Sequence, residues 1–147
     1  MITDMDAALA TTLFEEEVNK LKKGMNDWID TNDITVDGRI IYIYLTRKSD
    51  SKKFLLKIVC DGEFPLEPAD YFFVNPDTKQ DDSVEFWPNE GQDGFKTENQ
   101  NPRWICLAGT REYKKHHSEH QFNPKTNSLA QTTFHIFRQI NGWKRLV

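Results

Sequence analysis

The stretch ITVDGRIIYIYL, residues 34–45, decides the fold class of this chain. Most of its residues are β-branched or aromatic, which favours an extended strand over a helix. Two kinds of side chain alternate along its second half: Ile41, Ile43 and Leu45 against Tyr42 and Tyr44. Because successive side chains of a strand point to opposite faces, the alternation predicts a strand in a sheet with one buried face.

Two further apolar segments predict strands over residues 54–60 and 71–74. The polar stretch 47–52 lies between the first two strands and predicts a hairpin turn. Asp61-Gly62 and two prolines separate the second strand from the third. Since short connections join neighbouring antiparallel strands, we expect an antiparallel meander.

An amphipathic helix is predicted before these strands. Its apolar stripe consists of Leu9, Leu13, Val18, Leu21, Met25 and Trp28, with Phe14 at the edge. Its other face carries Glu15, Glu16, Glu17, Lys20, Lys22 and Lys23. This spacing predicts a helix of about 15–20 residues, with Gly24 at or near its end.

A second helix is predicted over residues 128–140, after the long polar loop 75–103. Its apolar repeat is Leu129, Thr133, Ile136, Phe137 and Ile140. Pro124 precedes the repeat and Asn141-Gly142 closes it, as is typical of helix ends. The order of helix, meander, long loop and helix indicates an α+β domain.

Length and charge limit the classes of function. A chain of 147 residues predicts one domain, residues 1–147, and the net charge of −4 argues against nucleic acid as a ligand. The acidic N-terminus has no apolar run of signal length, and no segment reaches the roughly 18 apolar residues that span a membrane. We therefore expect a cytoplasmic protein that binds no membrane, with Cys60 and Cys106 as free thiols.

Cys106 is the candidate nucleophile, because a thiolate attacks acyl groups readily. The flanking Ile105 and Leu107 would anchor the segment while Cys106 faces the other way. Nearby positive charge would raise the ionised fraction of the thiol; the basic residues close in sequence are Arg103, Arg111, Lys114 and Lys115. A buried structural cysteine is the alternative interpretation, and it is the one we expect for Cys60 at the end of its strand.

Motifs from residue 64 onward resemble those of ubiquitin-conjugating enzymes. Phe64-Pro65-Leu66-Glu67-Pro68 stands for the family's Tyr-Pro-x-x-Pro-Pro strand entry, and Trp87-Pro88-Asn89 for its His-Pro-Asn tripeptide. Ile105-Cys106-Leu107 stands for the Ile-Cys-Leu segment, and Phe122-Asn123-Pro124 for a Trp-Ser-Pro-like step before a helix. The resemblance implies an N-terminal helix, a four-stranded antiparallel meander, a long active-site loop and a C-terminal helix.

The resemblance also implies an activity. Cys106 would accept the C-terminal carboxyl group of a ubiquitin-like protein as a thioester from an activating enzyme, and would pass it to an amine of a protein substrate. Asn89 would brace the active-site loop or stabilise the oxyanion. No cofactor is implied, since ATP would be used on the activating enzyme. The helix face with Lys20, Lys22 and Lys23 resembles the family's docking surface for that enzyme; a solvated helical face is the alternative.

Departures from the family's pattern point to its compact bacterial members. Trp87 replaces the family's histidine, and the segment from Asn89 to Cys106 is longer than in eukaryotic members. Asn99, Asn101 and Asn123 are therefore alternative amide donors. Such bacterial members are encoded beside an activating enzyme, a ubiquitin-like protein and a metallopeptidase, and several serve in defence against phage.

Three histidines follow the cysteine: His116, His117 and His120. His117 and His120 are candidates to assist the thiolate or to deprotonate the incoming amine, and exposed loop histidines are the alternative. His116 and His120 have a spacing that can bind zinc, with Glu112 or Glu119 as further ligands. The glutamate of a His-Glu-x-x-His motif is missing between them, so we expect no metal site.

Two rival functions use the same residues. A non-catalytic module of the same fold would bind a ubiquitin-like protein or a partner peptide, and a thiol hydrolase would pair Cys106 with His117 or His120. Of the other residues, Trp87 and Trp104 are expected to pack around the loop. Asp77, Asp81 and Asp82 are expected to be solvated.

Overall fold

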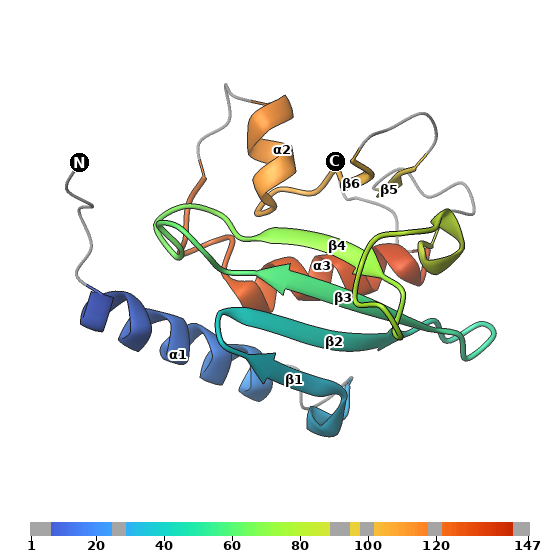
Figure 1. The fold of residues 1–147 in the computed structure, drawn as a ribbon, viewed down its shortest axis with the longest axis horizontal. Coiled ribbons are helices and arrows are strands. Elements are labelled where there is room, and N and C mark those ends of the chain that lie inside the picture. Colours follow the sequence, from blue (N-terminus) through green and yellow to red (C-terminus); the bar gives the residue numbers. More distant parts are fainter. Residues whose placement is uncertain (1–6, 25–28, 89–94, 98–101, 118–121, 143–147) are drawn as a thin grey trace.

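A computed structural model describes residues 7–24, 29–88, 95–97, 102–117 and 122–142. The elements in chain order are helix α1 (Ala7–Gly24), strands β1 (Ile34–Asp37), β2 (Ile40–Thr46), β3 (Lys53–Val59), β4 (Asp70–Val74), β5 (Phe95–Lys96) and β6 (Trp104–Ile105), and helices α2 (Arg111–His116) and α3 (Leu129–Ile140). Short 3₁₀ turns precede β1 and β5, η1 (Thr31–Asp33) and η2 (Val84–Phe86) (Figure 1).

Strands β1 to β4 form a four-stranded antiparallel sheet in sequential order, which confirms the meander. The prediction of a single strand over residues 34–45 is wrong, because the chain reverses direction within this stretch and forms two strands, β1 and β2. Gly38 has a φ of +60°, a conformation that an L side chain resists, and it places Asp37 opposite Ile40. Residues 34–45 therefore contribute two strands, and the sheet has four strands where the residue patterns predicted three.

The predicted turn over residues 47–52 is confirmed as the connection between β2 and β3. Arg47 donates two hydrogen bonds to the Asp50 carboxylate, at 3.0 and 2.7 Å. The Arg47 hydrogen bond lowers the pKa of Asp50 to about 2. The register that follows places Leu56 opposite Ile43 and Ile58 opposite Ile41, all of them buried.

Helix α1 ends at Gly24 as predicted, but its buried face differs from the predicted stripe. Leu9 is 50% exposed, whereas Phe14 at the expected edge is buried. Glu17, predicted on the polar face, is buried because its carboxylate accepts a hydrogen bond from the Leu129 backbone N–H at the start of α3. Met25 and Trp28 lie outside the described residues.

Helix α3 confirms the predicted C-terminal helix. All five residues of the predicted apolar repeat are buried: Leu129, Thr133, Ile136, Phe137 and Ile140. Ser128 caps the first turn, since its hydroxyl accepts from the Gln131 N–H while the Gln131 side chain accepts from the Ser128 N–H. Helix α3 packs against α1 and crosses behind β3 and β4 (Figure 1).

The long loop is not irregular throughout its described part. It contains η2 and strand β5, which pairs with β6. Trp87 is buried against Phe73, as expected of a packing residue. The expectation that Asp81 is merely solvated is wrong, because it accepts hydrogen bonds from Trp87 Nε1 at 2.8 Å and Arg103 Nη1 at 2.7 Å.

One hydrophobic cluster joins residues from α1, all four strands of the large sheet, β5, β6 and α3. Segments on both sides of Cys106 are therefore anchored in the same core as the sheet. Within the described ranges, none of the helices combines the length and apolar character needed to cross a membrane.

Candidate active site

Cys106 lies directly after strand β6, which holds it at the edge of the core. Residue Ile105 pairs with Phe95 of β5 and is fully buried, and Leu107 is buried as well. Cys106 between them is not in a disulfide and has intermediate exposure. The prediction that Ile105 and Leu107 anchor the segment while Cys106 turns away is confirmed.

A tight turn returns the chain from Cys106 toward the core. Gly109 has a φ of +102°, and a Cβ atom placed on it would lie 2.2 Å from Thr132 Oγ1 of α3. A side chain does not fit at this point, and the positive φ favours glycine. The turn after the cysteine is therefore docked directly on α3.

Helix α2 starts immediately after this turn and carries His117 at its end. Thr110 caps the first turn by accepting a hydrogen bond from the Tyr113 N–H, and the His117 N–H donates to the Tyr113 carbonyl at 2.8 Å. The His117 ring stacks on Tyr113 with 4.4 Å between ring centroids. In Figure 1, α2 stands above β4 beside β6.

Cys106 and His117, the two ends of the segment formed by the turn and α2, are in contact. Cys106 Sγ lies 3.8 Å from His117 Nε2, which is within hydrogen-bond range for sulfur. An imidazole at this distance can accept the thiol proton and stabilise the thiolate that results. The structure thus brings together two of the four residues predicted for catalysis.

The basic residues near Cys106 are engaged elsewhere. Each forms an ion pair with a carboxylate: Arg103 with Asp81, Arg111 with Asp61, Lys114 with Glu67, and Lys115 with Glu112. Their charges are therefore largely balanced by these partners. Activation of the thiol by a nearby lysine or arginine stays a prediction, and the contact that the structure gives the Cys106 thiol is with His117.

His116 has a different role from His117. Its ring stacks on Trp104 with 3.9 Å between centroids, and its Nε2 lies 3.8 Å from a Glu112 carboxylate oxygen. The contact ties α2 to β6 and confirms that Trp104 is a packing residue. His120 and Glu119, the other predicted zinc ligands, lie outside the described residues; among those that are described, no three His, Cys, Asp or Glu side chains are grouped as metal ligands would be.

The amide donor remains a prediction. Asn89, Asn99 and Asn101 lie outside the described residues, as does His120. Asn123 is exposed, and its side chain accepts a hydrogen bond from the Lys125 N–H within a turn before α3. Asn123 is therefore used locally as a turn residue.

Sequence reasoning missed Thr110, Gly109 and Tyr113, which shape the site. One signal was available: a threonine followed by Arg-Glu-Tyr-Lys-Lys-His is typical of a helix start. The i,i+4 spacing of Tyr113 and His117 was a second local signal, since side chains four positions apart meet on a helix. The contact of Gly109 with α3 depends on tertiary packing and leaves no local pattern.

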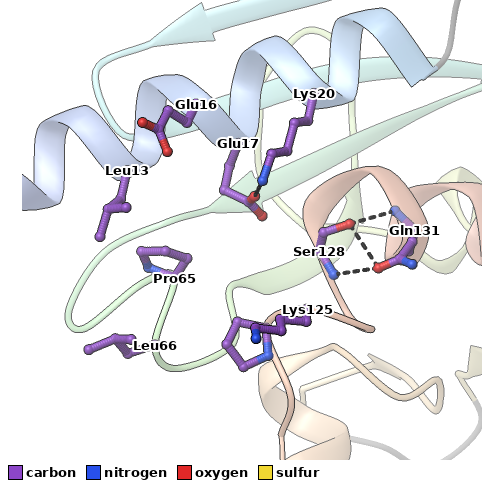
Figure 2. Close-up of a pocket in the computed structure, with 10 residues that line it drawn as sticks. Leu13, Glu16, Glu17, Lys20, Pro65, Leu66, Lys125, Ser128 and Gln131 are labelled. Carbon is purple, nitrogen blue, oxygen red and sulfur yellow. Dashed lines mark hydrogen bonds and ion pairs between the residues drawn. The ribbon is translucent and has the colours of Figure 1, made fainter.

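A second surface lies on α1, where partner-binding lysines were predicted. A cavity of about 450 Å³ opens between α1, the loop with Pro65 and Leu66, and the start of α3 (Figure 2). Lys20 lines it and pairs with Glu17 at 3.7 Å. Lys22 and Lys23 are exposed in the last turn of α1 but are not among its lining residues.

No protein-family model matches the chain, and no curated protein matches it at a significant level. The function is therefore inferred from the residues around Cys106 and from the fold that positions them.

Proposed function

We propose that this chain is a ubiquitin-conjugating-like transferase that carries a ubiquitin-like protein as a thioester on Cys106. The observation that carries the proposal is the partly exposed Cys106 thiol with His117 Nε2 at 3.8 Å. Access from solvent and a neighbouring histidine both favour a reactive thiol, and Cys106 has both.

The first step is a transthioesterification. The Cys106 thiolate attacks the acyl carbon of the thioester on the activating enzyme, the new carbon–sulfur bond forms, and the sulfur of the activating enzyme leaves as a thiolate. His117 takes up the Cys106 proton before the attack. No nucleotide is needed on this chain, because the acyl group arrives already activated.

The second step transfers the acyl group to an amine. The nitrogen attacks the thioester carbon, the carbon–sulfur bond to Cys106 breaks, and an amide forms while a base receives the amine proton. We assign that role to His117, once it has released to solvent the proton that it took from Cys106, with His120 as an additional candidate. Asn89 is the proposed oxyanion donor, a contribution worth about 2.7–4 kcal/mol in well-studied enzymes.

The arrangement of the fold supports this assignment. A helix, a four-stranded antiparallel meander, the cysteine segment and a final helix follow one another in the order of ubiquitin-conjugating enzymes. The motifs at Phe64-Pro65, Trp87-Pro88 and Ile105-Cys106-Leu107 keep the same order. We accordingly propose a compact bacterial member of that family, with an association with antiviral defence following from the family.

The α1 surface is the proposed docking site for the activating enzyme. Apolar side chains Leu13, Pro65 and Leu66 line the cavity beside Lys20, so a partner can bury apolar area and pair with a lysine (Figure 2). Reversing the charges of Lys20, Lys22 and Lys23 to glutamate should slow charging by the enzyme without changing alkylation of Cys106 by iodoacetamide. Lys52→Glu, in the hairpin turn, is the matched control.

The proposal is tested by a charging assay. The chain is incubated with ATP and with an activating enzyme and ubiquitin-like protein from the same genome, and products are separated with and without dithiothreitol. We expect a thiol-sensitive adduct that Cys106→Ala cannot form and Cys60→Ala still forms. An adduct that persists in Cys106→Ala, or no adduct with any such pair, contradicts the proposal.

The cysteine–histidine contact also suits a second function, a thiol hydrolase. That enzyme would cleave small thioesters with water and without an activating enzyme. Turnover of a model thioester that is lost in both Cys106→Ala and His117→Ala would favour hydrolysis. A single stoichiometric acyl transfer to Cys106, without turnover, favours the carrier.

A further inference from the structure

Thr110 makes three hydrogen bonds that connect the cysteine segment to the histidine helix. Its hydroxyl donates to the Ile105 carbonyl at 2.9 Å and to the Leu107 carbonyl at 3.0 Å. The same oxygen accepts from the Tyr113 N–H at 3.1 Å. The side chain is buried, with 1% of its surface exposed.

These bonds bracket Cys106 on both sides. The two carbonyls that accept the Thr110 hydroxyl belong to the residues immediately before and after the cysteine, so one proton is shared between them. The cysteine backbone therefore cannot rotate without breaking a bond to a buried group. Breaking such a bond is unfavourable because the buried group has no water to replace it.

The third bond fixes the other partner. Tyr113 begins its helical hydrogen bonding at Thr110, its ring stacks on His117, and its carbonyl accepts the His117 N–H. Arg111 anchors the same turn next to the large sheet, since its backbone N–H donates to the carbonyl of Ala69, the residue before β4, at 2.9 Å. The Thr110 hydroxyl is thus hydrogen-bonded both to the backbone around Cys106 and to the helix that carries His117.

We propose that Thr110 is a positioning residue that sets the distance between Cys106 and His117. This inference rests on the proposed use of Cys106 as a nucleophile with His117 as its base. It assigns Thr110 no contact with substrate. It predicts that Thr110 affects reactivity through His117, which distinguishes it from a residue that only stabilises the fold.

The test is the rate of Cys106 alkylation by iodoacetamide in the full chain. At pH 7, Thr110→Val, which keeps the shape but removes the hydroxyl, should slow the reaction by about fivefold or more, because the thiolate is no longer held against its base. Thr110→Ser, which keeps the hydroxyl, should stay within about twofold of the parent. At pH 10, where an ordinary thiol ionises without help, the difference should disappear.

A double-mutant cycle separates positioning from general loosening. In a His117→Ala background, Thr110→Val should change the alkylation rate by less than about twofold, because the group through which it acts is gone. Equal slowing with and without His117, or faster alkylation in Thr110→Val, overturns the proposal. Thr133→Val is the control: Thr133 is also fully buried, and its hydroxyl has no hydrogen-bond partner in the described part of the chain.

The serine variant keeps the test decisive if the valine variant does not fold, as judged by circular dichroism. A folded Thr110→Ser that alkylates as slowly as His117→Ala overturns the proposal, and one that matches the parent supports it. Iodoacetamide needs neither ATP nor a ubiquitin-like protein. A failure of the charging assay with an intact Thr110–His117 coupling would therefore overturn the transferase function and leave this inference standing.

Discussion

At the scale of single residues, the proposed chemistry depends on the contact between Cys106 and His117. The two side chains are eleven positions apart in sequence and 3.8 Å apart in space. A turn docked on α3 and the six-residue helix α2 close that separation. The proposed reactivity therefore depends on how this one short segment is positioned.

The first prediction concerns His117. His117→Ala should slow iodoacetamide alkylation of Cys106 by about tenfold at pH 7, because the base that ionises the thiol is removed. His135→Ala, on the exposed face of α3, should leave the rate unchanged. Equal rates for the parent and His117→Ala, measured by mass spectrometry over time, would show that the 3.8 Å contact does not activate the thiol.

The second prediction concerns Gly109. Gly109→Ala should lower the free energy of unfolding by about 2–4 kcal/mol, since a Cβ atom meets Thr132 Oγ1 and the backbone favours glycine. Gly38→Ala is the control, because Gly38 also has a positive φ, but no described residue other than its chain neighbours comes within 4 Å of its Cβ position. Gly38→Ala should lower the free energy of unfolding, measured by urea unfolding, by about 1 kcal/mol.

Steric conflict in Gly109→Ala can be separated from backbone strain by a second change. Thr132→Ala removes the atom that the new Cβ would meet, so the double variant should recover part of the loss. If Gly109→Ala costs no more than Gly38→Ala, the close approach of the turn to α3 is not as the structure describes it.

At the scale of elements, α1 and α3 are joined by a buried carboxylate. Glu17 of α1 accepts from the Leu129 N–H at 3.3 Å, at the N-terminus of α3, where backbone N–H groups lack helical partners. A negative charge is favourable at that end of a helix. This bond explains why an acidic residue belongs to the buried face of α1, and the Glu17 side chain also lines the cavity in Figure 2.

The third prediction follows from that bond. Glu17→Ala should lower the free energy of unfolding by about 1–3 kcal/mol, because it leaves a buried N–H without its acceptor. Glu17→Gln keeps an acceptor and should recover about half of the loss. Glu16→Ala, on the exposed side of the same helix, should change stability by less than about 0.5 kcal/mol. Equal effects at the two positions would contradict the role of Glu17.

At the scale of the whole molecule, one core encloses ionisable groups that titrate only at high pH. Cys60 is fully buried, and burial raises the pKa of its thiol from 9.0 to about 12. Burial also raises the pKa of Tyr71 well above 10. Both groups stay protonated in the folded chain over a range in which the unfolded chain loses the protons.

The fourth prediction is the resulting alkaline loss of stability. Above pH 9 the unfolded state binds fewer protons than the folded state, so the free energy of unfolding falls as pH rises toward 12. One such group contributes at most about 1.4 kcal/mol per pH unit. Urea unfolding at pH 8, 9 and 10 should show the decline, and Cys60→Ala should show a shallower one. A flat profile in the parent chain would mean that Cys60 is not enclosed.

The sequence by itself determined the periodic parts of this protein. Alternation over residues 40–45, the helical repeat over 129–140 and the flanking of Cys106 by Ile105 and Leu107 are local patterns of burial, and each was confirmed. Local patterns suffice there because each element must present an apolar face to one core. The turn at Gly38 was missed, because the β-branched and aromatic residues on both sides of it made residues 34–45 look like one continuous strand.

Tertiary structure alone decided the candidate site. Three features depend on partners far apart in sequence or across a turn: which histidine contacts Cys106, the Thr110 hydrogen bonds on both sides of it, and the hydrogen bonds of Asp81 and Glu17. No periodicity encodes such contacts, since a polar side chain at one position can face solvent or a distant partner equally well. Packing of the turn on α3 and of α2 on β6 makes that choice.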